Sequence, residues 1–188
     1  MSQWTMPIKG KFKYGPLFGV KDSWHPNGHR GVDYNGFKGG TPYVAVNDGV
    51  IALNTWSNVL GNIVVLQVGK HFFGYCHMDK PSPLKVGTKV RSGDVIGSAG
   101  TTGSASSGVH LHLTLSLDKN GVIGGKVYDA DGFIKKQIAA QVAAAKKAAA
   151  APAVAPAAPA AAPAVAEATC EHCKQPLPKT VKGVAHAE

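Results

Sequence analysis

Hydrophobic and polar residues alternate over short segments in the first two thirds of the chain, and glycine-containing turn sequences separate these segments. Alternation with a period of two is typical of strands that bury one face. The pattern predicts strands over residues 43–46, 50–54, 62–68, 71–77, 89–90, 95–98 and 109–117. Their close spacing indicates a mainly β fold, a compact sandwich or barrel in which antiparallel pairs dominate.

The pattern changes near residue 133, where the period of two gives way to a helical one. Hydrophobic residues recur every four positions at Ile134, Ile138 and Val142, which predicts a modest amphipathic helix. Asp129 and Asp131 precede this run, and an aspartate side chain there can cap the start of the helix.

Alanine and proline dominate residues 148–168, and repeated prolines favour an extended, semi-rigid spacer. The short polar tail that follows contains Cys170 and Cys173, which are spaced as half of a structural zinc site. Three readings stay open for it: a second zinc ion, half a site that another chain completes, or a segment without fixed structure. The sequence thus predicts a β domain over 1–133, a helix and linker over 134–168, and a tail over 169–188.

The formal net charge is +9 with neutral histidines, which favours polyanionic partners such as nucleic acid, anionic lipid or cell-wall polymer. The lysines are spread singly along the sequence, so we predict neither a nucleic-acid partner nor, since no run approaches about 18 apolar residues, insertion into a membrane. The odd and sparse cysteines argue against a disulfide framework. Because the N-terminal residues lack the apolar stretch of a secretory signal, we expect synthesis in the cytoplasm.

Paired metal-binding residue types occur at two places in the sequence. In the last predicted strand, His110 and His112 share a face, because residues two apart in a strand point to the same side. His29 and Asp33 also share a face if their segment is extended, and a bend at Gly31 would bring both to one ion. Imidazole nitrogen and carboxylate oxygen are both zinc ligands, although each pair alone is a weak signal.

Together with His77, these pairs are typical of a catalytic zinc site rather than a structural one. Such a site uses three protein ligands and leaves one position open for water. Five side chains are available, so two histidines would remain for proton transfer near neutral pH. His77 by itself, at the end of the apolar run 71–77, would be an ordinary core or surface histidine.

The order and spacing of these segments resemble the lysostaphin-type zinc endopeptidases, which hydrolyse peptide bonds in bacterial peptidoglycan. The resemblance covers residues 18–133 and rests on His29-Arg-Gly-Val-Asp33, Tyr75-Cys-His77, Gly100-Thr-Thr-Gly103 and Ser107-Gly-Val-His110-Leu-His112. It implies that zinc is bound by His29, Asp33 and His112, and that the catalytic pair is His77 and His110. It also implies an antiparallel β fold with the site in a groove. Thr114 stands where the family has an acidic residue, so His112 needs another supporting partner.

The resemblance further implies Zn²⁺ as cofactor and peptidoglycan as substrate and partner. We expect Trp56 and Tyr34 to contact the substrate, Trp56 because its polar surroundings at 54–58 are typical of a loop. Without an export signal, delivery to the wall would depend on a phage, either as a lysin released at lysis or as a component of the virion.

Three alternatives compete with the enzyme. A non-catalytic wall-binding or virion structural protein would keep the fold, but all five site residues are present. A lipoyl-type carrier would share the hairpin pattern of residues 86–97, yet the lysine that such a carrier displays in a tight turn is missing. A cupin-type oxidase needs a glutamate ligand soon after its histidine pair, and no glutamate precedes Glu167.

Overall fold

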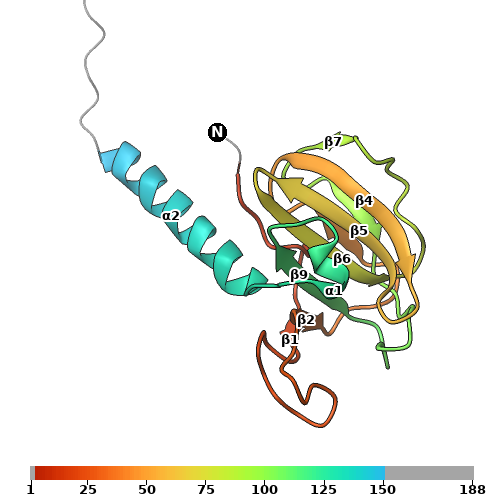
Figure 1. Ribbon diagram of the computed structural model, residues 1–188. Coiled ribbons are helices and arrows are strands. Elements are labelled where there is room, and N and C mark those ends of the chain that lie inside the picture. Colours follow the sequence, from red (N-terminus) through yellow and green to blue (C-terminus); the bar gives the residue numbers. More distant parts are fainter. Residues whose placement is uncertain (1–2, 151–188) are drawn as a thin grey trace, which may run out of the picture. The chain divides into compact units, whose positions relative to one another are not determined.

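The computed structural model describes residues 3–150, and the linker beyond 150 and the tail with Cys170 and Cys173 lie outside this range. Within it, a seven-stranded antiparallel sheet forms the body of the protein (Figure 1). Its strand order is β1 (Lys13–Tyr14), β2 (Val32–Asn35), β9 (Leu111–Ser116), β6 (His71–Met78), β5 (Gly61–Val68), β4 (Gly49–Ser57) and β7 (Lys89–Val90). A second, two-stranded sheet pairs β3 (Pro42–Val44) with β8 (Val95–Ser98).

The predicted mainly β fold is confirmed, and each predicted strand coincides with one of β3 to β9 to within a few residues. Three short elements were not predicted: β1, β2 and the single helical turn α1 (Gly121–Gly124). The loop predicted around Trp56 is wrong over most of its length, because β4 continues to Ser57 and pairs Trp56 with Asn62 of β5. Cross-strand pairing with the hydrophobic β5 thus overrides the polar composition of this segment.

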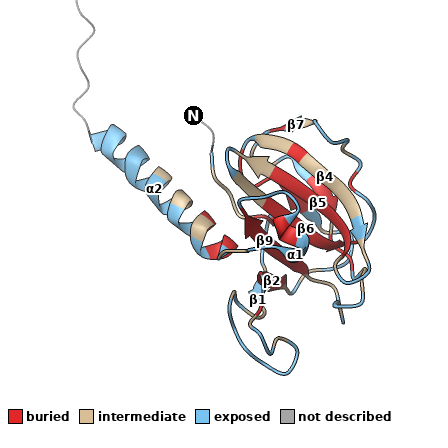
Figure 2. Ribbon diagram, in the orientation of Figure 1, coloured by how far each residue is buried: buried red, intermediate tan, exposed pale blue. Residues whose placement is uncertain are grey.

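The sheet buries hydrophobic residues on both faces, as the red central strands of Figure 2 show. The main core lies on the face that also receives β3 and β8, and its members include Val64, Leu66, Phe73, Tyr75, Leu111 and Leu113. A smaller cluster lies on the other face and contains Ile63, Val65, Cys76 and Val122. Because side chains alternate along a strand, the residues of β9 between the core leucines point toward the smaller cluster.

The helix α2 (Ala130–Ala150) follows the last strand and is anchored by its first turn. Its start is capped as predicted, since the Asp129 side chain accepts a hydrogen bond of 2.9 Å from the Gly132 backbone N–H. The Asp131 carboxylate accepts bonds from the hydroxyls of Tyr14 and Tyr34. From residue 142 onward the helix is exposed. None of the helices in the described residues has the length and apolar character needed to cross a membrane.

Candidate metal centre and catalytic cleft

Two neighbouring strands and the segment before them bring three metal-binding side chains together. Asp33 of β2 and His112 of β9 are direct cross-strand partners. His29 is held in place before β2, where its backbone N–H bonds to Val20 and its carbonyl accepts from Gly19. Gly31 permits the close approach of the two segments, because a Cβ atom there would lie 2.6 Å from the carbonyl oxygen of Leu113.

The donor atoms of His29, Asp33 and His112 converge on one point. Nδ1 of His112 lies 2.9 Å from Oδ1 of Asp33 and 3.0 Å from Nε2 of His29. Nε2 of His29 lies 3.3 Å from Oδ1 of Asp33. Ligands about 2.0–2.1 Å from a tetrahedral zinc ion lie about 3.3 Å from one another, so this donor set fits the ion. All three side chains are buried, and no other such group occurs within residues 3–150.

The charges of this group favour a bound cation. Burial alone would raise the pKa of Asp33, but hydrogen bonds with His112 and His29 outweigh it and hold that pKa well below its usual range. Burial lowers the pKa of His112 despite its bond with Asp33, so that ring is neutral near pH 7. For His29, burial opposes protonation, yet the bond with Asp33 raises its pKa. An ionised carboxylate beside imidazole rings has the ligand chemistry that zinc requires.

His77 reaches the same place through a local irregularity in β6. The pairing of β5 with β6 shifts between Asn62 and Val64, so that Cys76 and His77 together oppose the single residue Ile63. His77 has φ 57°, a left-handed conformation that few non-glycine residues adopt. Regular alternation after Phe73 and Tyr75 would direct His77 into the main core. The bulge instead turns the side chain into the site, a role that bulges have near many active sites.

The rings of His77 and His110 lie side by side, with centroids 4.7 Å apart. Nδ1 of His77 is 2.7 Å from the carbonyl oxygen of Thr102, and Nδ1 of His110 is 2.8 Å from that of Gly108. Because a carbonyl only accepts, each Nδ1 carries the proton and each Nε2 of the neutral ring keeps its lone pair. Burial lowers the pKa of His77 to about 4, so it is uncharged at neutral pH.

The five side chains line a cleft of about 1010 Å³. One wall comes from the segment before β2, and the other from the loops that follow β4 and precede β9. The additional lining residues include Asp22, Trp24, His25, Arg30, Ser57, Leu60, Ser106, Val109, Thr114, Val122 and Ile123. The five side chains that the sequence predicts as metal ligands and catalytic pair therefore lie together in one cleft.

The two residues predicted to contact substrate are not found in the cleft lining. Tyr34 is fully buried and its hydroxyl bonds to Asp131 at 2.9 Å, so the prediction for Tyr34 is wrong. It alternates with Asp33 along β2 and consequently faces the core. Trp56 is 55% exposed but lies outside the cleft lining, whereas Trp24, which sequence reasoning missed, is 81% exposed and lies within it. Trp24 also lies in a polar stretch of the sequence, which is the same feature that predicted a substrate contact for Trp56.

Thr114 follows His112 on the same face of β9 and shows what replaces the acidic residue expected there. Its side chain is 1% exposed, and its hydroxyl has no hydrogen-bond partner among the residues that the structure describes. The two hydrogen bonds of the His112 ring are both at Nδ1, with His29 and Asp33, so Thr114 does not orient that ring. Asp33 and His29 support His112 in its place.

Comparison with known proteins places this arrangement in a family. Residues 27–123, more than half of the chain, match the model of peptidase family M23. The chain belongs to peptidase family M23. Among relatives, it is 35% identical to the glycyl-glycine endopeptidase ALE-1 of Staphylococcus capitis over 63% of this chain, and 35% identical to lysostaphin of Staphylococcus simulans over 60% of this chain.

Solved peptidase structures share the fold. The catalytic domain of the antimicrobial peptidase lysostaphin from Staphylococcus simulans is 31% identical, with a TM-score of 0.56 over 66% of this chain and 92% of that one. A zinc-containing peptidase from Vibrio cholerae is 27% identical, with a TM-score of 0.55 over 66% of this chain and 37% of that one. The matched part of the chain spans only 33% of the length of ALE-1 and 22% of the length of lysostaphin. It spans 38% of the length of a third relative, a metalloprotease of Buchnera aphidicola.

Proposed function

We propose that this M23 peptidase is a zinc-dependent endopeptidase that hydrolyses peptide bonds in bacterial peptidoglycan. The observation that carries the proposal is the convergence of three ligand atoms beside two histidines whose Nε2 atoms are available. The names of its relatives support the substrate class, since one is a glycyl-glycine endopeptidase and another is the peptidoglycan DD-endopeptidase ShyC of Vibrio cholerae.

In this proposal, His29, Asp33 and His112 hold the zinc ion, and their donor atoms already lie within 4.8 Å of one another. A bound zinc ion supplies Lewis acidity, which lowers the pKa of water to about 7 and polarises the carbonyl group of a peptide bond. Asp33 contributes the negative charge, and burial of the three side chains excludes bulk water from around them.

His77 and His110 move the protons. Each ring is fixed by its Nδ1–H bond to a backbone carbonyl, so only Nε2 is available to accept a proton from the attacking water. After accepting it, the ring is an imidazolium that donates from Nε2, either to the developing oxyanion or to the leaving amine. One ring accepts the proton of the water and returns it to the leaving amine, and the other ring, when it is protonated at Nε2, donates to the oxyanion. The two rings are anchored alike, so either ring can take either task.

Digestion of purified peptidoglycan tests the proposal. The full chain, loaded with zinc, should release new amine ends, lose this activity with a chelator, and regain it when zinc is added back. Mass spectrometry of the products from several wall types identifies the bond. Failure to cleave any wall type by a zinc-loaded protein would refute the proposal, and retained binding to the wall would favour the non-catalytic alternative. Delivery by a phage stays a prediction from the sequence.

A further inference from the structure

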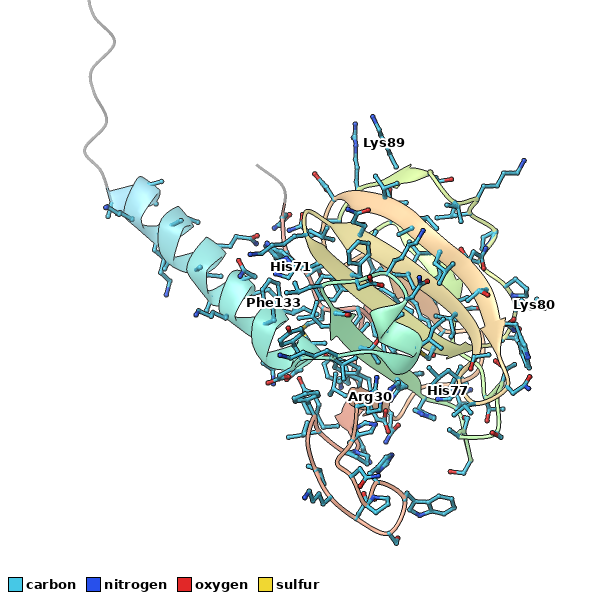
Figure 3. The ribbon with its side chains drawn as sticks, viewed as in Figure 1. Arg30, His71, His77, Lys80, Lys89 and Phe133 are labelled. Atoms are coloured by element: carbon cyan, nitrogen blue, oxygen red, sulfur yellow. The ribbon has the colours of Figure 1, made fainter. Side chains whose placement is uncertain are left out.

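One end of the cleft is formed by Arg30 together with residues that follow β9. Arg30 comes directly after the ligand His29, and its Nη2 donates a 2.6 Å hydrogen bond to the carbonyl oxygen of Gly125. Val122 and Ile123 of α1 line the cleft beside it. Figure 3 shows Arg30 and His77 at the same end of the sheet, with Lys89 at the opposite end. The bond to Gly125 fixes the direction of the Arg30 side chain.

The positive charge of Arg30 is not balanced inside the cleft. Arg30 is the one lysine or arginine in the described cleft lining, and no carboxylate of residues 3–150 lies within 4.0 Å of it. The two lining carboxylates are engaged elsewhere, because Asp22 bonds to His25 and Asp33 belongs to the metal group. The bond to Gly125 uses one N–H, so the guanidinium keeps other donors for a ligand.

A second observation at the same end of the cleft points to a polar ligand. The hydroxyl of Thr114 is buried and unpartnered in the part of the chain that the structure describes, although Thr114 lines the cleft. A Cβ atom at Gly74 would lie 2.6 Å from this hydroxyl and 3.0 Å from Cβ of Val122, so Thr114 and Val122 are neighbours. Buried hydroxyls are normally hydrogen-bonded, and a bound molecule can supply the missing partner.

We propose that this end of the cleft is a subsite for a carboxylate close to the scissile bond of the substrate. Arg30 pairs with the carboxylate, for which a planar guanidinium is well suited, and Thr114 contributes a hydroxyl on the cleft floor. The subsite selects stem peptides with a free acid group over amidated peptides and over neutral glycine bridges. This inference rests on the proposed endopeptidase function and names its substrate class.

The test uses pairs of peptides that share the bond identified by wall digestion and differ only in a free carboxylate or a carboxamide beside it. The zinc-loaded full chain should cleave the acid form with a kcat/KM about 10-fold or more above that of the amide, as expected for a lost charged hydrogen bond. Arg30→Gln should bring this ratio close to 1, and Thr114→Val should reduce it. Lys89→Gln removes the same charge at the opposite end of the sheet and should leave the ratio unchanged.

Binding separates failure of this inference from failure of the proposed function. Both peptides are titrated into zinc-loaded His77→Ala protein and into the same protein carrying Arg30→Gln, with amide chemical shifts as the readout. Tighter binding of the acid form that depends on Arg30 supports the subsite even if no peptide is cleaved. Cleavage of both forms at equal rates, or an acid preference that survives Arg30→Gln, overturns the subsite and leaves the endopeptidase intact.

Discussion

The two faces of strand β9 are built on different principles. Leu111, Leu113 and Leu115 lie on one face and join the main core, where they are 3% exposed or less. His112 and Thr114 lie on the other face and are equally inaccessible, at 7% and 1% exposure. The strand therefore buries a hydrophobic face and a polar face at once, and burial alone does not distinguish core from site.

What separates the two faces is how each compensates for the loss of water. The leucines gain free energy by burial, about 25 cal/mol for each Å² of apolar surface. The polar face gains nothing from burial and depends on partners, because an unpaired buried polar group costs free energy. His112 finds these partners in Asp33 and His29. Substitutions on the first face should thus affect stability, and those on the second should affect metal binding and turnover.

The largest effect is expected for Asp33→Ala on the polar face. Loss of the proposed carboxylate ligand should release zinc and lower kcat/KM by more than about 10³-fold, since a catalytic zinc ion supplies several kcal/mol of transition-state stabilisation. Zinc content by elemental analysis and cleavage of peptidoglycan measure the two effects. Asp79→Ala, which removes an exposed carboxylate, is the control and should retain both zinc and activity. Full zinc content in the Asp33 variant would disprove its assignment as a ligand.

The next effect is expected for His77→Ala, which should lower kcat by about 10²–10⁴-fold, the usual contribution of a general acid or base. Zinc should stay bound, because the three ligands are untouched. His71 is the matched control, since it lies at the other end of β6 and packs on Phe133 of α2. His71→Ala should keep kcat near that of the unmodified protein. Equal losses in the two variants would show that the site does not depend on His77 specifically.

On the hydrophobic face, Leu113→Ala should reduce the free energy of unfolding by about 2–5 kcal/mol, because it opens a cavity at a fully buried position. Chemical denaturation measures this change. The folded fraction should still bind zinc and cleave peptidoglycan with nearly unchanged kcat. A variant that is as stable as the parent but inactive would contradict the division between the two faces.

The smallest effect is expected where strand β2 repeats the same division, with Asp33 on the site face and Tyr34 on the core face. Asp131→Ala removes the acceptor of the Tyr34 hydroxyl and should cost about 1–3 kcal/mol of unfolding free energy. Tyr34→Phe should cost less, because Asp131 keeps its bonds with Tyr14 and Lys135. A larger loss for Tyr34→Phe than for Asp131→Ala would show that the Tyr34 hydroxyl contributes more to stability than the Asp131 carboxylate that accepts from it.

Alternation carried most of the fold prediction, because strands that bury one face must repeat every second residue. The same rule placed His110 and His112 on one side of the predicted strand 109–117, and the resemblance to the lysostaphin-type endopeptidases implied the further roles of His29, Asp33 and His77. Strand β2 was missed because four residues between glycine-rich segments are too short to show a period. Tyr34 was misplaced for the same reason, since its face follows from the pairing of β2 with β9.

Other features of the site depend on contacts that no local pattern encodes. The bulge at Cys76 and His77 arises from a shift in pairing with β5, which only the assembled sheet reveals. Trp24 and Arg30 enter the cleft because the segment before β2 folds along it, and its conformation is set by backbone bonds such as that from Gly28 to His25. Local sequence patterns thus indicate the five side chains that lie together in the cleft better than the residues that shape the space around them.

The bulge in β6 also determines which kinds of mutation the protein can tolerate over evolution. Point substitutions along β6 change one side chain and leave the others facing as before. Deletion of Tyr75 or Cys76 would remove the bulge, and regular alternation from Phe73 would then still direct the histidine to the site face. We therefore expect homologous chains that keep this number of residues between Gly74 and His77 to keep the bulge, and homologous chains that lack the bulge to be one residue shorter there.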